Sequence, residues 1–253
     1  YEIRPRDWSS DVCSSDLPPP PNFSDGAFTI CKLIFTSNRR EANGFGWSTD
    51  YPFSGLNLML RSSELTKTRI SRDRKGDARY WTVHLSAETL FDCPFLVGSD
   101  VGTIDLAPIE VARLREYLLK GGFLWVDDYW GSRAAAQFED AMREVLPEFQ
   151  AFDIPMDHPI RRTLFEVGEV PQVPGINFWR ASGGGTAERG ADSPGADFRG
   201  IADGHGRIMV VMTHNTDVGD SWEREGDDPR FFQQFSPDGY ALGINVLVYA
   251  LSH

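Results

Sequence analysis

The stretch Gly121–Gly131 constrains the fold of this chain more than any other feature of its sequence. A predicted helix over Glu110–Lys120 runs into two glycines, and the apolar run Phe123–Val126 follows them. This order predicts a turn and a buried strand, with Asp127 and Asp128 directly after the strand. Because open α/β sheets bind ligands beyond the carboxyl ends of their strands, this stretch is the first candidate for a functional site.

Short apolar runs alternate along the chain with stretches of helical periodicity. The predicted strands are Phe28–Phe35, Tyr80–Leu85, Phe95–Gly98, Phe123–Val126, Ile176–Arg180 and Arg207–Thr213, the last one in a hairpin with Phe198–Ala202. The predicted helices are Ser54–Thr66, one that Pro108 opens, Arg133–Leu146 capped by Ser132, and Asp238–Leu251. The predicted long loops are Ser37–Phe53, Ser182–Gly200 and Val218–Pro237. This alternation predicts a three-layer, doubly wound, flavodoxin-like α/β fold with a mostly parallel sheet and long loop insertions.

Residues 1–26 are predicted to lie outside the folded domain, which we expect to be a single domain over residues 27–253. The segment 7–17 resembles a translated sequencing adapter, and the short polyproline run Pro18–Pro21 reads as a linker. The native N-terminus is therefore expected to be missing, together with any signal peptide. The formal net charge of −12 disfavours nucleic acid as a partner, and no apolar run is long enough to predict a transmembrane segment.

The cysteines outside the adapter-like segment are Cys31 and Cys93. Cys31 lies inside an apolar run, so a buried, inert thiol is the default expectation. A disulfide between the two is the alternative if the protein is exported. Two cysteines are too few to predict a zinc site, and we predict no metal site and no cofactor.

Several segments together resemble one bacterial family, the domain of unknown function 4159. They are Gly46–Pro52, Gly121–Gly131, Asp157–Ile160, Met212–Asn215 and Phe235–Tyr240. The resemblance implies a fold similar to that of class I glutamine amidotransferases and trehalose-utilisation-type proteins. It also implies export or attachment to the bacterial envelope, but it implies no reaction.

The amidotransferase comparison bears on the strand Phe123–Val126. Enzymes of that class carry a cysteine nucleophile at a tight turn after the corresponding strand, whereas this chain has Asp127 and Asp128 there. We therefore expect thiolate chemistry of that kind to be absent. Successive strand residues point to opposite faces, so one aspartate is expected to face a ligand while the other orders a helix or meets Arg133.

A second candidate group follows the strand Arg207–Thr213. His214, Asn215 and Asp217 are expected at the same edge of a parallel sheet as Asp127. A histidine beside a carboxylate is typical of a general base with its orienting group, or of ligands for a divalent metal. The alternative is that His214 binds a backbone carbonyl in a polar loop.

Aromatic residues accompany the acids in the predicted loops. They are Trp47, Tyr51, Tyr129, Trp130, Trp179 and Trp222. Aromatic rings beside carboxylates suit carbohydrate binding, although loop aromatics more often anchor a loop to the core. The full set of predicted ligand-binding residues is Asp50, Tyr51, Asp100, Asp127, Asp128, Tyr129, Trp130, His214, Asn215 and Asp217.

Two functions fit these observations. The first is a non-catalytic domain of the bacterial envelope, exported or periplasmic, that binds a small polar or carbohydrate ligand or a protein partner. The alternative is a hydrolase, metal-assisted or not, that acts on a glycan or another small polar substrate. In that case Asp127, Asp128 and His214 are the catalytic candidates, and at least one carboxylate should lie within about 3–4 Å of His214, around an open pocket.

Overall fold

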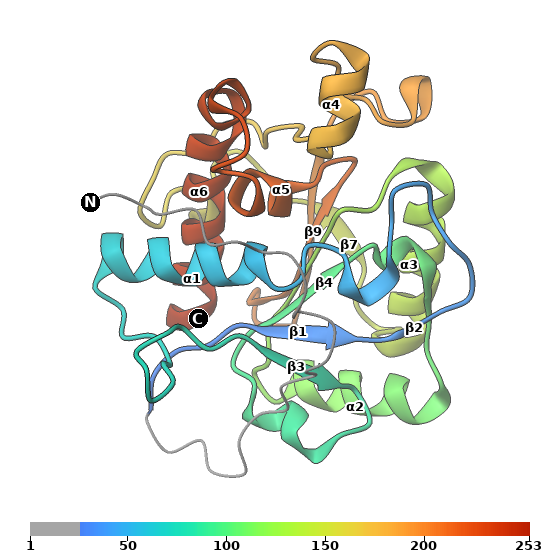
Figure 1. Ribbon diagram of the computed structural model, residues 1–253. Coiled ribbons are helices and arrows are strands. Elements are labelled where there is room, and N and C mark those ends of the chain that lie inside the picture. The colour runs from blue at the N-terminus through green and yellow to red at the C-terminus, as the bar shows by residue number, and fades with distance from the viewer. Residues whose placement is uncertain (1–25) are drawn as a thin grey trace.

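The computed structural model describes residues 26–253, so the adapter-like segment 7–17 and the run Pro18–Pro21 lie outside the described residues. The strands are β1 (Cys31–Ile34), β2 (Thr36–Ser37), β3 (Trp81–His84), β4 (Leu96–Ser99), β5 (Ile104–Asp105), β6 (Leu124–Asp127), β7 (Ala151–Asp153), β8 (Asp197–Ala202) and β9 (Ile208–His214). Seven of them form one sheet in the order β3-β1-β4-β6-β9-β8-β7, and β2 pairs with β5 (Figure 1).

The strand order defines the fold. Strands β3, β1, β4, β6 and β9 run parallel, while β8 is antiparallel to both of its neighbours. Numbered along the chain, the five parallel strands have the order 2-1-3-4-5, which is the flavodoxin order. The predicted α/β class with a mostly parallel sheet is therefore confirmed.

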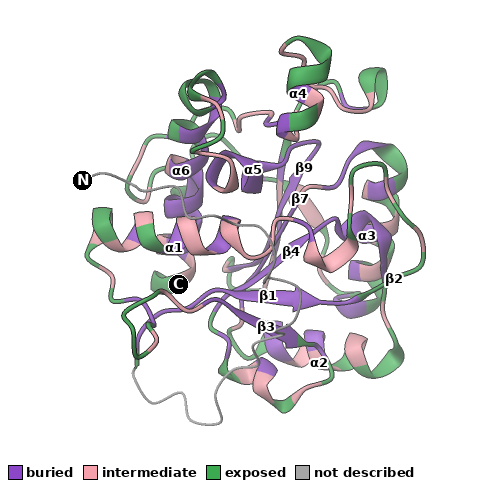
Figure 2. Cartoon of the chain, in the orientation of Figure 1, coloured by how far each residue is buried: buried purple, intermediate pink, exposed green. Residues whose placement is uncertain are grey.

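Helices cover both faces of the large sheet. The helices are α1 (Phe53–Thr66), α2 (Pro108–Leu119), α3 (Gly131–Val145), α4 (Ile176–Ser182), α5 (Val218–Glu223) and α6 (Pro229–Ser252), of which α4 packs on α6. Helices α2 and α3 pack on one face, and α1, α5 and α6 pack on the other (Figure 1). Strand β6 serves both cores, because Leu124 and Val126 pack toward α2 and α3 while Trp125 packs toward α5 and α6. Its four residues are all buried, as is usual for a central parallel strand, and its neighbours β4 and β9 are buried along their whole length as well (Figure 2).

The strand predicted over Ile176–Arg180 is wrong, because these residues begin helix α4. Ile176 and Trp179 lie three positions apart and share one helical face. That face packs against Phe231 and Phe235 of α6, and the Trp179 and Phe231 ring centroids are 5.4 Å apart. Tertiary packing thus outweighs the β propensity of the apolar residues in this segment.

The predicted loop Val218–Pro237 is also wrong, because it contains α5 and the first turns of α6. Asp228 caps α6 by accepting a hydrogen bond from the backbone N–H of Arg230 (2.8 Å), and Pro229 occupies the first turn. The helix continues through Pro237, which lies on its exposed side. The packing of the preceding turns against α4 offsets the hydrogen bond that this proline removes.

The cap predicted for α3 differs as well. The helix begins at Gly131, so Ser132 lies inside its first turn and does not cap it. Instead, the backbone N–H of Ser132 donates to the carboxylate of Asp192 at 3.0 Å. A side chain distant in sequence therefore satisfies a free amide at the start of the helix.

Cys31 and Cys93 form a disulfide, with the two sulfurs 2.17 Å apart. The default expectation of an inert thiol at Cys31 is therefore wrong. The bridge joins β1 to the residues just before β4. Within residues 26–253, no helix combines the length and the apolar composition that a membrane span requires.

Candidate functional site

Three neighbouring strands end in the same backbone conformation at the carboxyl edge of the sheet. The residues that follow β4, β6 and β9 have positive φ angles: Asp100 (53°), Asp128 (52°) and Asn215 (58°). This left-handed region costs most L-residues about 1–2 kcal/mol, and Asp and Asn are the usual non-glycine exceptions. The N–H of Asp100 donates to the carbonyl of Asp128 (3.0 Å), and that of Asn215 donates to Tyr129 (3.0 Å). The three strand ends are therefore linked to one another.

Asp127 and Asp128 point in different directions. The carboxylate of Asp127 accepts hydrogen bonds from the hydroxyl of Thr213 (2.6 Å) and the backbone N–H of Gly219 (2.8 Å). Both of its oxygens are thus engaged, and they tie β6 to β9 and to the first turn of α5. Asp128 instead faces a cavity and accepts a hydrogen bond from the indole of Trp130 (2.9 Å).

The cavity has a volume of about 250 Å³ and lies beyond the carboxyl ends of the parallel strands. Its walls come from the segments that follow β1, β4, β6 and β9, together with residues 175–189. The seven acids that line it are Glu41, Asp50, Asp100, Asp128, Glu188, Asp217 and Asp220. The two arginines that line it are Arg189 and Arg224. The cavity therefore occupies the edge where flavodoxin-like folds bind ligands, and its lining is strongly acidic.

The predicted site residues divide into two groups of equal size. Those that line the cavity are Asp50, Asp100, Asp128, Trp130 and Asp217. Those that do not line it are Tyr51, Asp127, Tyr129, His214 and Asn215. Of the three catalytic candidates, Asp128 alone lines the cavity.

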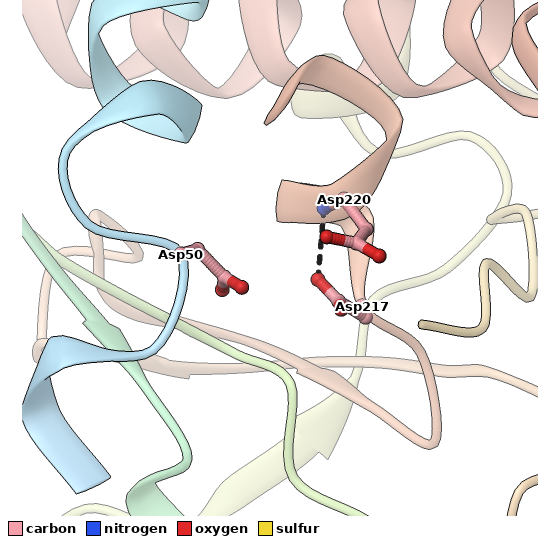
Figure 3. A group of neighbouring side chains, drawn as sticks. All are labelled: Asp50, Asp217 and Asp220. Atoms are coloured by element: carbon pink, nitrogen blue, oxygen red, sulfur yellow. Dashed lines mark hydrogen bonds between the residues drawn. The ribbon is translucent and has the colours of Figure 1, made fainter. Parts of the chain in front are cut away.

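Asp50, Asp217 and Asp220 form the closest group of acids in the cavity (Figure 3). One carboxylate oxygen from each lies within 4.8 Å of the others, and all three side chains are buried. Asp217 is the N-cap of α5 and accepts from the backbone N–H of Asp220 (2.8 Å), while Asp220 accepts from the N–H of Ile176 (2.8 Å). In contrast, Oδ2 of Asp50 is buried and has no hydrogen-bond partner among the described residues.

Burial without full charge compensation raises the pKa values of Asp100, Asp128, Asp217 and Asp220. Burial raises the pKa of Asp220 to about 7 and that of Asp100 to about 6. For Asp128, burial and then repulsion from Asp50 raise the pKa well above its usual range. Burial and then repulsion from Asp128 do the same to the pKa of Asp217. Each negative charge here makes its neighbours harder to ionise.

One buried lysine lies next to this group. Lys32 is on β1 and is fully buried, and its ammonium donates to the carbonyl of Thr49 (2.7 Å) and the hydroxyl of Ser99 (2.7 Å). Burial lowers the pKa of Lys32, although the charges of Asp50 and Asp128 oppose that shift. The lysine thus holds the strand ends together and compensates for only part of the negative charge.

His214 is held on both sides of its ring. Nδ1 lies 2.8 Å from a carboxylate oxygen of Asp197, and Nε2 lies 3.1 Å from the carbonyl of Gly131. The ring packs against Tyr129 at 4.9 Å between centroids. A carboxylate therefore lies within the expected distance of His214, but both nitrogens are engaged and the pair does not line the cavity.

Most of the predicted aromatic residues anchor loops. Tyr51 packs between Trp47 and Tyr80, at 5.8 and 5.5 Å between ring centroids. Trp130 reaches the cavity although it is only 4% exposed. Two aromatic side chains that were not predicted also line the cavity: Phe45, which is 67% exposed, and Phe178, which is half-buried.

The sequence reasoning also missed Asp220, Glu188 and Lys32. Asp220 has a recognisable signal, because an acid three residues after the N-cap Asp217 is a common helix start. Glu188 lies in a loop without periodicity, and Lys32 is one polar residue in an apolar strand. Neither residue carries a local pattern that links it to the cavity.

These features define an α/β protein with flavodoxin strand order and an acid-lined cavity at the carboxyl edge of its sheet. The chain belongs to the family described as Domain of unknown function (DUF4159), whose model matches residues 38–251. The family resemblance drawn from the sequence is therefore confirmed. No curated protein matches the chain.

Proposed function

We propose that this protein binds a small polar ligand in the acid-lined cavity and is not a histidine-dependent enzyme. The observation that carries this proposal is the convergence of seven acidic side chains, from segments far apart in sequence, on one cavity of about 250 Å³. Carboxylates accept hydrogen bonds from hydroxyl and ammonium groups. The cavity therefore suits a ligand rich in such donors, such as a sugar, an amino sugar or an amine.

The size of the cavity limits the ligand. Pockets for drug-sized ligands have volumes of about 300–1,000 Å³, so this cavity suits a smaller ligand or one end of a longer chain. Phe45 at the rim offers an exposed ring for stacking, and the guanidinium of Arg40 lies 5.8 Å from the centroid of that ring. These features favour a sugar unit over a purely aliphatic amine.

Hydrolysis of a glycan or another polar substrate is the alternative function, and the position of His214 weakens it. A general base must reach the proton that it removes. Both ring nitrogens of His214 are engaged by Asp197 and Gly131, outside the cavity. In addition, both described cysteines are in a disulfide, so neither supplies a thiolate within residues 26–253.

The Cys31–Cys93 disulfide supports the export of this protein. Disulfides persist in oxidising compartments such as the bacterial periplasm and are rare in the cytosol. Export to the envelope therefore remains part of the proposal.

Thermal shift with a neutral sugar, an amino sugar and a diamine, each with and without EDTA, tests the binding proposal. We expect at least one of them to raise the Tm of the wild type and to lose about tenfold or more in affinity in D128N. Asn at this position keeps the left-handed backbone and an acceptor for Trp130, so the fold should persist. The control is D140N, because Asp140 is an exposed acid of α3 outside the cavity. No shift across the panel, or equal affinity in D128N and the wild type, contradicts the proposal.

A further inference from the structure

We propose that Asp50, Asp217 and Asp220 bind a divalent cation of the Mg²⁺, Mn²⁺ and Ca²⁺ class at the wall of the cavity. Their carboxylate oxygens lie within 4.8 Å of one another. Opposite ligands of one ion are about 4.0–5.2 Å apart, since Mg²⁺–O and Ca²⁺–O distances are about 2.0–2.6 Å. The three oxygens are thus close enough to share one ion. This inference deepens the proposed binding function and rests on the same cavity.

The unpartnered oxygen of Asp50 is the observation that separates this group from an ordinary acidic cluster. Oδ2 of Asp50 is buried without a hydrogen-bond partner among the described residues, and the side chain points toward Asp217 and Asp220 (Figure 3). Buried carboxylates are normally paired or bound to a metal, because isolating their charge is costly. A cation between the three acids would satisfy this oxygen.

The hydrogen bonds of the other two acids leave room for an ion. The N–H of Asp220 uses one oxygen of Asp217, and Asp220 itself binds the N–H of Ile176 and lies 3.3 Å from Nε of Arg224. Each carboxylate oxygen has two lone pairs, so these contacts do not exhaust the acceptors. Both acids are also held in place by these bonds, which lowers the ordering cost of binding an ion.

The local charge favours a cation over further hydrogen bonds. Among the described residues, no ion pair reaches Asp50 or Asp217. The nearby cations are committed elsewhere, because Lys32 donates to Thr49 and Ser99, and Arg224 pairs with Asp220, Glu223 and Asp227. A dication would supply the missing positive charge.

A glycine allows this close approach. A Cβ atom at position 219, in the first turn of α5, would lie 3.0 Å from Oδ2 of Asp50 and 3.3 Å from Oδ1 of Asp217. Without that Cβ, the loop carrying Asp50 can lie against the start of the helix. The local backbone thus brings carboxylates from two distant segments together.

The ligand set indicates the kind of ion. All three ligands are carboxylate oxygens, which suit the hard ions Mg²⁺, Mn²⁺ and Ca²⁺ better than soft or borderline ions. Three protein ligands leave about three of six positions for water or for oxygens of a bound molecule. The adjoining cavity has space for both, so a hydroxyl-bearing ligand could bind the ion directly.

Counting bound Mn²⁺ by electron paramagnetic resonance on EDTA-treated, dialysed protein tests the inference without an organic ligand. We expect one Mn²⁺ per chain, displaced by excess Mg²⁺ or Ca²⁺. D50N should weaken Mn²⁺ binding about 10–100-fold or more, since even the loss of an outer partner of a metal ligand has effects of that size. The exposed-acid control D140N should bind Mn²⁺ as the wild type does. No binding at millimolar Mn²⁺, or equal binding by D50N and the wild type, overturns the inference.

A second variant covers the case in which D50N does not fold. D217N retains a good N-cap for α5, because Asn is as effective there as Asp, but it removes one charge from the cation ligands. We expect it to lose Mn²⁺ affinity while keeping its circular dichroism spectrum, and unchanged affinity would also overturn the inference. Mn²⁺ binding without any sugar or amine binding would contradict the proposed function and leave the cation site standing. If a sugar or amine binds in the presence of EDTA and the protein binds no Mn²⁺, the result contradicts the cation site and leaves the proposed function standing.

Discussion

Two groups of polar residues lie at the same edge of the sheet and differ in how their polar atoms are satisfied. Both carboxylate oxygens of Asp127 and both ring nitrogens of His214 contact other protein groups. In the cavity, and among residues 26–253, Asp50 keeps a buried oxygen without a partner, and the carboxylate of Asp128 has the indole of Trp130 as its donor. Position at the strand ends is therefore not enough to identify a binding residue. Counting the partners of each polar atom shows which of these side chains have all their polar atoms satisfied within the protein.

The largest loss of stability is expected from D127A, because both carboxylate oxygens of Asp127 accept hydrogen bonds. The N–H of Gly219 loses its acceptor, and the hydroxyl of Thr213 keeps only the carbonyl of Val126 (3.1 Å), so the free energy of unfolding should fall by about 1–3 kcal/mol. Urea denaturation at neutral pH measures this change. D127N keeps one acceptor oxygen and should lose less. If D127A is as stable as the wild type, Asp127 does not hold the strand ends together.

A smaller effect is expected from the pH dependence of stability at Asp100. Burial raises the pKa of Asp100 from 3.8 to about 6, although its hydrogen bond from the N–H of Gly46 opposes that shift. Between these two values the folded chain binds the proton more tightly than the unfolded chain does. The contribution of this group to stability therefore falls as the pH rises from about 4 to about 6.

The variant D100N removes this proton while keeping an acceptor for Gly46 and a residue that tolerates positive φ. The decline of Tm between pH 4 and pH 6 should therefore be shallower in D100N than in the wild type. D140N, which changes an exposed acid, should follow the wild-type profile. Identical profiles for D100N and the wild type would show that Asp100 does not titrate in this window.

The smallest effect is expected from D50N in EDTA. Since Oδ2 of Asp50 has no hydrogen-bond partner in the part of the chain that the structure describes, the substitution removes negative charge and breaks no hydrogen bond at that oxygen. The free energy of unfolding should therefore not fall below that of the wild type, because a buried, uncompensated charge is costly and its removal also relieves repulsion from the neighbouring carboxylates. Urea denaturation under the conditions used for D127A gives the comparison. A loss of stability as large as that of D127A would show that the side chain of Asp50 holds the fold together, as Asp127 does.

The sequence predicted the fold through the elements whose patterns are local. The apolar run before Asp127 became β6, and Pro108 opens α2 as expected. Parallel packing then explains why the segments after β6 and β9 meet at one edge. The prediction that Asp127 and Asp128 face different ways also follows from strand geometry alone.

The missed elements depend on partners far away in the chain. Helix α4 is held by Trp179 against Phe231, a contact that no local pattern contains. The cavity has the same origin, because Asp50 and Asp220 meet only after α1 and α5 pack together. The burial of each acid and its hydrogen-bond partners decide whether it is free to contact a ligand. Both are properties of the folded chain.

The left-handed residues after β4, β6 and β9 affect how related sequences should be compared. Only Asp, Asn and Gly fit positions 100, 128 and 215 at low cost, whatever the protein binds. If an aspartate recurs at these positions in other family members, the positive φ angle alone is enough to explain it, and no ligand needs to be invoked. Position 50 shares the positive φ, at 62°, so the informative variation there is between Asp and Asn or Gly. A cation site would keep the charge, whereas a turn would accept all three residues.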